Sequence, residues 1–509
     1  MSRQSKLLLE RYRYMGGYLG LIMYVMAVIM LVPLIMIAFV PSEARYAPTF
    51  VLTAALLGAI GFLLRFAFKL KEQAALDFNE SSVVVFLTWA ILSLAGTIPY
   101  MAISGMTFTQ AVFDSISGWT TTGLSLLDIP KAPAIILFYR AWAQFVGGAG
   151  IAIIMLASLT GVGSQQIYSA EGKGTLIKPN VLASTRIVLK LYMGYFVLGT
   201  VAYLICGMRM FDAVVHCFAA ISTGGFSNYV QSMGYFNSPA IEFISIVLMI
   251  LGNLSFLMGY YIVKGKFRHM WRNGEVRVLT LSLLVSIPVL FLAVTSRIYS
   301  SASFAFRDAC FEAVSALTTT GFSLVNYTQP MWYDSGVFIL TLLMLVGGGT
   351  CSTAGGIKQY RIYMLYKSVL WHIKASLMPN HTVSKKYVWE GDLKSYPDAS
   401  SFRRIANFVF LYLSIYVTGV IILALSTNPA TGTPYSLRDA MFEFASSLGT
   451  VGLTIGVSST SAPQHVIWVE SIGMLLGRLE IYVVFLALIK LFRDSVGHIS
   501  IRRNAQRAA

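Results

Sequence analysis

Four segments of the chain end in threonine- and glycine-rich tips that align with one another. The segments are 110–125, 212–227, 308–323 and 439–454, and each has alanine at its second position. Each also has one shared glycine near its end; these are Gly123, Gly225, Gly321 and Gly452. Glycine adopts backbone dihedrals that other residues resist, so it can turn neighbouring carbonyl groups in an unusual direction. Four such tips around one axis would form a ring of backbone carbonyls.

A ring of carbonyls has a specific chemistry, because carbonyl oxygens can replace the hydration shell of a potassium ion. The tips therefore predict a K⁺ selectivity filter. The predicted ligands are the carbonyl groups of the two residues before each shared glycine, namely Thr121, Thr122, Thr223, Gly224, Thr319, Thr320, Thr450 and Val451. Tip four departs from the pattern, since Gly449 stands where tips one and three have threonine. The extra flexibility of this glycine is expected to loosen selectivity.

One aligned position within the four segments carries polar side chains, which are Asp114, His216, Glu312 and Glu443. Acidic groups near a pore mouth would attract cations. Alternatively, they would hold the loops in place through hydrogen bonds to backbone amides. We favour this positioning role for Glu312 and Glu443.

The elements that position these tips lie in a membrane. Of the 509 residues, 56% are apolar and 12% are charged, against about a quarter charged in soluble domains. Crossing a bilayer takes roughly 20 apolar residues. Ten windows qualify, near 14–40, 47–70, 82–104, 134–161, 187–207, 238–264, 276–298, 334–372, 403–427 and 464–491. The first window is too long for a signal peptide. The four cysteines lack CxxC spacing, so neither a disulfide framework nor a zinc site is predicted.

Each aligned segment falls between two predicted spans. The predicted fold is an all-α integral membrane protein with four covalently linked span–pore-loop–span repeats around a pseudo-fourfold axis. Two extra N-terminal transmembrane helices bring it to ten spans. The predicted boundaries are 1–80 for the extra helices, 81–165, 186–266, 275–372 and 403–491 for repeats one to four, 373–402 for a cytoplasmic connector, and 492–509 for a basic tail.

The distribution of positive charge predicts the orientation. Most of the 38 lysines and arginines lie on the side shared by both termini. The exceptions on the other side are Arg45, Lys131, Arg140, Arg209, Arg297, Arg307 and Arg438. The positive-inside rule then places both termini in the cytoplasm and the tips toward the outside.

The eighth window contains five glycines between residues 347 and 356, which would break a helix within the membrane. They are Gly347, Gly348, Gly349, Gly355 and Gly356, and the other repeats have no comparable glycine run. This segment is predicted to be a gate beneath the tips. Arg478, inside the last window, is costly to place in a bilayer. Its expected partner is Glu480, Glu470 or the carbonyls of the glycine segment.

These features together resemble the superfamily of K⁺ transporters that includes bacterial TrkH and KtrB. The four tips, GGGTCSTAGGIK (347–358) and GRLE (477–480) carry the resemblance. The two extra N-terminal spans, FVGGAGIAIIML (145–156) and YFNSPAIEFISIV (235–247) favour the TrkH-type branch. The resemblance covers essentially the whole chain.

The resemblance implies potassium uptake across the bacterial inner (plasma) membrane, with K⁺ as the transported ion. It also implies a homodimer with one pore per protomer and a cytosolic RCK-domain partner (TrkA-type) that binds nucleotides and controls the gate. No nucleotide is expected on this chain. In the family the gate is the broken helix, which corresponds to 347–356, with Arg478 beside it. Plant relatives with serine at the first filter glycine tend to admit sodium, so Gly123 implies a preference for potassium.

Two other functions remain as alternatives. A symporter coupling K⁺ to Na⁺ or H⁺ would need intramembrane carboxylates on the ion path, but Glu242, Glu470 and Glu480 are poorly clustered in the sequence. A multi-span membrane enzyme is a remote alternative, because no paired acids, Walker loop or dinucleotide fingerprint are found.

Overall fold

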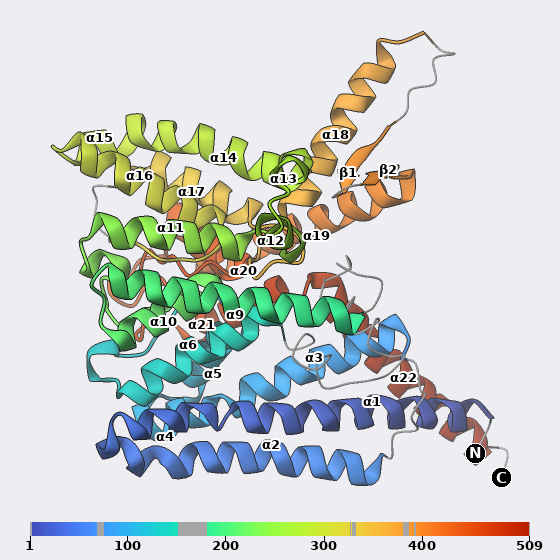
Figure 1. The fold of residues 1–509 in the computed structure, drawn as a ribbon. Coiled ribbons are helices and arrows are strands. Elements are labelled where there is room, and N and C mark those ends of the chain that lie inside the picture. Colours follow the sequence, from blue (N-terminus) through green and yellow to red (C-terminus); the bar gives the residue numbers. More distant parts are fainter. Residues whose placement is uncertain are drawn as a thin grey trace.

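The computed structural model describes residues 3–68, 76–150, 181–325, 327, 332–379, 386–390 and 393–507. Most of the described chain is helical, and the long helices lie side by side in layers (Figure 1). The first layer is α1 (Arg3–Ile29) and α2 (Ala47–Ala67), joined by the 3-10 helices η1 (Val32–Ala38) and η2 (Pro41–Tyr46). These are the two extra N-terminal helices of the sequence prediction.

The remaining helices follow one pattern four times: a long helix, a short buried half-helix and a return helix. In unit one these are α3 (Phe78–Ala95) with α4 (Thr97–Ser104), α5 (Phe108–Trp119) and α6 (Ala134–Ala149). In unit two they are α9 (Val181–Ile205), α10 (Met210–Ile221) and α11 (Pro239–Asn253) with α12 (Phe256–Val263).

Units three and four repeat the pattern. In unit three the helices are α14 (Gly274–Leu290) extended by η5 (Phe291–Thr295) and α15 (Ser296–Ile298), then α16 (Ala302–Leu317) and α17 (Asp334–Val346) with α18 (Gln359–Ser376). In unit four they are α19 (Ala399–Leu425), α20 (Leu437–Gly449) and α21 (Gln464–Arg478) with α22 (Ile481–Arg507). The short helix α13 (Phe267–Arg272) joins units two and three.

The four half-helices pack in a cyclic order. Each contacts the return helix of the preceding unit: α10 packs on α6, α16 on α11, α20 on α17, and α5 on α21. The second-position alanines Ala111, Ala213, Ala309 and Ala440 are each 0% exposed. A methyl side chain lets helices approach closely, so these alanines permit the tight packing of the half-helices.

Six helical segments among the described residues are long and apolar enough to cross a membrane, and eight are if two bent helix pairs each count as one span. The bends are 118° between α11 and α12 and 103° between α21 and α22. The predicted spans 238–264 and 464–491 each correspond to one bent helix pair, and the breaks within them were not predicted. The predicted span 134–161 is described only as far as Gly150, and residues 151–161 lie outside the described part. The count of ten spans stays a prediction.

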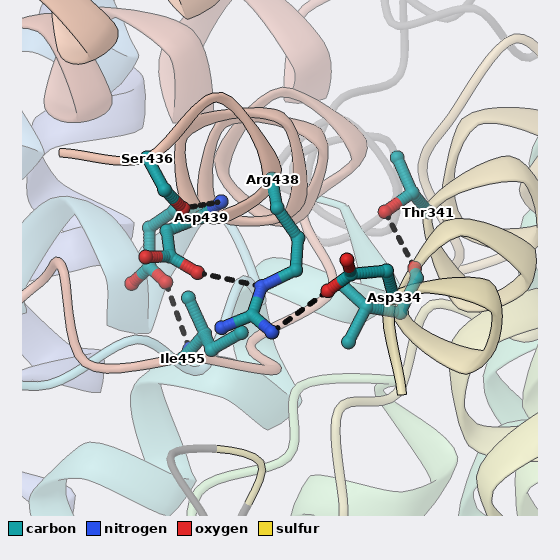
Figure 2. Close-up of polar contacts among 8 residues, drawn as sticks. Asp334, Thr341, Ser436, Arg438, Asp439 and Ile455 are labelled. Atoms are coloured by element: carbon teal, nitrogen blue, oxygen red, sulfur yellow. Dashed lines mark hydrogen bonds and ion pairs between the residues drawn. The ribbon is translucent and has the colours of Figure 1, made fainter. Parts of the chain in front are cut away.

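Polar contacts at helix N-termini join separate parts of the fold. The Arg438 guanidinium of α20 donates to Asp334 of α17 at 2.9 Å and to Asp439 at 3.0 Å (Figure 2). The N–H groups of Ala134 and Ile135 donate to the buried Glu43 carboxylate, each at 2.8 Å. Glu43 thus caps the first turn of α6, where backbone N–H groups lack helical partners.

The predicted connector 373–402 is not purely irregular, and the fold is not purely helical. Strands β1 (Val388–Glu390) and β2 (Leu393–Ser395) pair antiparallel beside α18 (Figure 1). Val388 is 1% exposed and packs with Tyr363 and Met364 of α18. The Arg272 guanidinium lies 4.8 Å from the centre of the Trp389 ring. Because the segment is polar overall, this short apolar face gives only a weak sequence signal.

Candidate functional site

The four tips meet in a closed ring, called here the tip ring (residues 120–123, 222–225, 318–321 and 449–452). The backbone of the next unit lies directly against each shared glycine. A Cβ atom added to any of the four glycines would come closer than 3.0 Å to a carbonyl oxygen of a neighbouring tip. The glycine and carbonyl pairs are Gly123 with Gly224 O, Gly225 with Thr320 O, Gly321 with Val451 O, and Gly452 with Thr122 O. The contacts run from unit one through unit four and back to unit one. Four of the eight predicted ligand carbonyls therefore line this ring.

The tip backbone is strained in the same way four times. Thr121, Thr223, Thr319 and Thr450 have φ of 57°, 52°, 54° and 51°, and the glycines two residues later have φ between 72° and 101°. A positive φ is an outlier for a β-branched residue. Such strain costs roughly 1–3 kcal/mol per residue and persists only where surrounding contacts enforce it. All four threonines are 0–1% exposed.

The first set of enforcing contacts comes from the aligned polar position. Its carboxylates accept hydrogen bonds from a hydroxyl eleven residues later and a backbone N–H twelve residues later. These donors are Ser125 and Leu126 for Asp114, Ser323 and Leu324 for Glu312, and Thr454 and Ile455 for Glu443 (Ile455 is labelled in Figure 2). In unit two, His216 Nε2 instead lies 2.9 Å from Ser227 Oγ. These bonds support the positioning role over cation attraction.

A second set of contacts holds the shared glycines, and unit two again differs. The N–H groups of Gly123 and Gly452 each donate to a serine of their own half-helix, Ser117 and Ser446, at 3.0 Å. Unit two has Ala219 at this position. Its tip is held by Gln144 of α6, which donates to Gly224 O at 2.5 Å and accepts from Phe226 N–H at 3.2 Å. Alignment of the four segments cannot reveal Gln144, because it lies outside them.

The glycine segment forms a compact loop, called here the glycine loop (residues 347–358). Gly347 and Gly356 have φ of 68° and 78°. The loop closes through bonds from Gly348 N–H to Gly355 O at 3.1 Å and from Ile357 N–H to Leu345 O at 3.0 Å. Gly349 N–H donates to Asn253 O at 3.1 Å, which joins the loop to the break between α11 and α12.

The glycine loop lies directly against the threonine side of the tip ring. Gly355 N–H donates to Thr319 Oγ1 at 2.8 Å. The Thr353 hydroxyl lies 3.1 Å from Thr223 Oγ1 and donates to Gly252 O at 2.9 Å. An added Cβ at Gly355 would meet Gly449 O and Thr450 Oγ1 closer than 3.0 Å. The loop therefore contacts three of the four tips.

Arg478 bonds the glycine loop and the end of α6 through backbone carbonyl groups. Its Nη1 donates to Thr353 O at 2.5 Å, and its Nη2 donates to Gly147 O and to Gly148 O, the latter at 3.3 Å. Of the three expected partners, the loop carbonyls are therefore correct. Glu480 instead pairs with Arg361 at 2.6 Å. Arg478 thus ties the loop of unit three to the end of α6 in unit one.

The interruption of the return helix is not peculiar to unit three. Helix α11 ends at Asn253 and α21 ends at Arg478, followed by Glu480 at a φ of 53°. Helix α6 ends at Ala149, with Gly150 at a φ of 88°. The glycine run is unique among the units, but the expectation that only unit three is broken is wrong. Each break uses different residues, so aligned sequences conceal it.

The opposite side of the tip ring opens into a cavity of about 690 Å³. Its lining includes the four shared glycines, together with Asp128 and Arg140. The ring therefore separates an open cavity from a space filled by the glycine loop.

Four tips meeting in a closed ring, among helices long and apolar enough to cross a membrane, are the arrangement of a membrane transporter. The chain belongs to the TrkH family of cation transport proteins, whose family model matches residues 47–496. This assignment is consistent with the cyclic packing of the four half-helices.

Several relatives carry explicit descriptions. The chain is 32% identical to the Trk system potassium uptake protein TrkH of Escherichia coli, over 81% of this chain and 86% of the relative. It is 28% identical to an uncharacterized cation transporter of Methanocaldococcus jannaschii, over 93% of this chain and 94% of the relative. The crystal structure of the potassium transporter TrkH from Vibrio parahaemolyticus superposes with a TM-score of 0.80 at 26% identity, covering 94% of this chain and 98% of that one.

Proposed function

We propose that this chain takes up potassium ions across the bacterial inner membrane through the tip ring. The observation that carries the proposal is the closed circuit of four glycine–carbonyl contacts. The family membership and the potassium transport named for its relatives support the choice of ion. The ion is the cargo of this site and not a resident cofactor.

In this proposal the ligands are the carbonyl groups of the two residues before each shared glycine. They are Thr121, Thr122, Thr223, Gly224, Thr319, Thr320, Thr450 and Val451. The half-helices α5, α10, α16 and α20 end within one residue of the ring. Their C-termini carry partial negative charge, which favours a cation at the centre of the ring.

The glycine loop acts as the gate of the proposed pathway. Conduction requires Thr353 and Gly355 to move away from the tip threonines. Arg478 opposes this movement, because a guanidinium bonded to carbonyl oxygens forms stronger hydrogen bonds than neutral donors. Gly347, Gly348, Gly349, Gly355 and Gly356 give the loop backbone its freedom to rearrange.

The transport unit in this proposal is a ten-span protein with both termini in the cytoplasm. The distribution of lysine and arginine supports that orientation. A homodimer and a cytosolic RCK-domain partner of TrkA type, which binds the nucleotide that this chain does not bind, complete the proposed system. The name "Trk system", which several relatives carry, supports the existence of further components.

The coupled symporter is the less favoured alternative. Glu242 is bound by Arg307 through two hydrogen bonds, at 2.9 and 2.5 Å, and Glu480 is bound by Arg361. Two of the three acids considered for a symporter are therefore held in ion pairs, and removing such an acid from its partner would leave a buried charge uncompensated.

The test is a flux measurement on the purified chain in lipid vesicles. We expect K⁺ flux that exceeds Na⁺ flux, and a further change when the cytosolic partner and its nucleotide are added. Equal flux of the two ions would contradict the filter assignment. An absolute requirement for a Na⁺ or H⁺ gradient would replace the channel-like proposal with the symporter.

A further inference from the structure

Two buried glutamates behind the fourth tip share one hydroxyl group. Glu443 on α20 and Glu470 on α21 are each 0% exposed. Ser458 Oγ lies 2.5 Å from Glu443 Oε1 and 2.8 Å from Glu470 Oε2. This pair is invisible in the sequence, where 27 residues separate the two acids.

The number of hydrogens decides the charge of this cluster. A serine hydroxyl has one hydrogen to donate and can also accept. It can therefore donate to one carboxyl group only, and the other carboxyl must carry a proton and donate to Ser458 Oγ. Repulsion between like charges also opposes the ionisation of both carboxyl groups in one buried site.

The environment of each acid identifies the ionised one. Glu443 accepts from the Thr454 hydroxyl at 2.7 Å, from Ile455 N–H at 2.9 Å and from Ser458 N–H at 3.0 Å, in addition to Ser458 Oγ. Among the residues that the structure describes, Glu470 is bonded by Ser458 alone, and its Oε1 has no hydrogen-bond partner. A buried carboxylate without donors is strongly disfavoured, whereas a neutral acid costs far less.

We propose that Glu470 is a neutral carboxylic acid whose O–H positions Ser458, and through Ser458 and Glu443 the fourth tip, making it a specificity-determining residue. The hydrogen-bond chain runs from Glu470 Oε2–H to Ser458 Oγ and from Ser458 Oγ–H to Glu443 Oε1. Glu443 in turn holds the backbone at Ile455, three residues after Gly452. The effect on ion selection rests on the proposed function, while the protonation state of Glu470 does not.

Other titratable groups around this pair do not change the assignment of Glu470 as the neutral acid and Glu443 as the ionised one. Tyr435 lies close enough to both carboxyl groups to interact electrostatically, and it adds no positive charge. Asp439 is engaged by Arg438, and His465 at the start of α21 lies 2.8 Å from Ser426. Asp114 on the neighbouring α5 is bonded by its own loop.

Unit one shows that this position can also carry a charge. Gly147 and Gly477 occupy equivalent positions in the return helices of units one and four. A Cβ atom added to Gly147 would meet Trp119 O near the end of α5, and one added to Gly477 would meet Leu448 O near the end of α20. Seven residues before these glycines stand Arg140 and Glu470. Arg140 is 2% exposed and its guanidinium lies 4.0 Å from the centre of the Phe226 ring. In unit one the Arg140 cation therefore lies near Asp114, the acid that bonds the loop after the tip. In unit four the same position carries the neutral donor Glu470 beside Glu443.

The experiment compares two Glu→Gln substitutions within one cluster. Infrared difference spectroscopy of the purified full chain in lipid vesicles records the C=O stretch of protonated carboxylic acids. We expect a carboxylic acid band in the wild type that is absent in Glu470→Gln and retained in Glu443→Gln. If the Glu470→Gln spectrum matches the wild type in this region, Glu470 is ionised and the inference is overturned.

Ion flux tests the positioning role. Glu470→Leu removes the donor and is expected to lower K⁺/Na⁺ discrimination by roughly fivefold, the range of a lost hydrogen bond between neutral groups. Glu470→Gln keeps an N–H donor toward Ser458 and is expected to restore discrimination. Glu443→Gln places an amide N–H among donors and is expected to lower it. Loss of discrimination in Glu470→Gln, with the protein folded, would contradict the role. Failure of wild-type K⁺ flux would overturn the proposed function but leave the infrared result standing.

Discussion

The tip ring and the layer of helix breaks beneath it lie next to each other but are built in opposite ways. In the ring, the four units repeat the same backbone conformation, with a left-handed threonine followed two residues later by a left-handed glycine. In the layer below, α6 ends at Ala149, and the return helices of units two, three and four are interrupted after Asn253, over 347–358 and after Arg478. Equivalence is kept where four carbonyl groups must surround one point. It is lost where a single segment fills the space below the ring.

The largest expected effect comes from breaking the equivalence of the ring. Gly123→Ser or Gly452→Ser would place a Cβ against a carbonyl oxygen of a neighbouring tip. We expect K⁺/Na⁺ discrimination to fall by about tenfold or more, since the left-handed conformation alone costs a non-glycine residue roughly 1–2 kcal/mol. Vesicle flux ratios measure this effect.

Gly105→Ser is the matched control for the ring substitutions. Gly105 has a φ of 66° but no heavy atom within 4 Å of an added Cβ. It therefore imposes a similar backbone strain without touching the ring. Unchanged flux ratios in both ring variants would remove the filter assignment.

The second-largest effect is expected where Arg478 bonds the glycine loop and the end of α6. Arg478→Gln removes the charged donor that holds Thr353 O and the end of α6. Hydrogen bonds to charged groups contribute about 1.5–3 kcal/mol, so partner-independent K⁺ flux is expected to rise roughly tenfold. Arg268→Gln, at an exposed position on α13, is the control. A fall in flux would show that Arg478 supports the open state instead.

A smaller effect is expected at the contact between the glycine loop and the tips. Thr353→Val keeps the shape but removes the hydroxyl that bonds Gly252 O and Thr223 Oγ1. A neutral hydrogen bond contributes about 1 kcal/mol, which corresponds to a rise in partner-independent flux of roughly fivefold. Thr418→Val, which loses only a bond to Ser414 O within α19, is the control. Equal flux in the two variants would argue against a contribution of Thr353 to closure.

The smallest effect is expected where units three and four meet at their outer ends. Arg438→Met breaks the contacts to Asp334 and Asp439 (Figure 2). Asp334 is 83% exposed and Arg438 is 38% exposed, so water weakens this ion pair. Exposed pairs contribute about 0–1 kcal/mol. Thermal unfolding in detergent should shift only slightly, and K⁺/Na⁺ discrimination should be unchanged. A large loss of discrimination would mean that the Arg438 contacts set the geometry of the tip ring, rather than the hydrogen bonds that Asp114, Glu312 and Glu443 accept from the loops after the tips.

The sequence predicted the repeated elements well, because each of them is specified locally. The half-helices and the glycine loop lie where the pattern placed them, and Thr121 and its equivalents lie beside the shared glycines in one ring. It failed where a single window hid two helices. The windows 238–264 and 464–491 are apolar on average although each contains charged residues, so mean hydropathy does not mark the bends near Leu254 and Leu479.

The sequence by itself determined the four tips, the membrane setting and the repeated order of helices. These depend on glycine conformation, apolar composition and spacing, which are properties of neighbouring residues. Only the tertiary structure decided that Gln144 replaces a serine in unit two, that Arg478 binds Thr353 O, and that Glu443 meets Glu470 through Ser458. Each of these contacts joins different helices or loops, so it exists only once the cyclic packing brings those elements together.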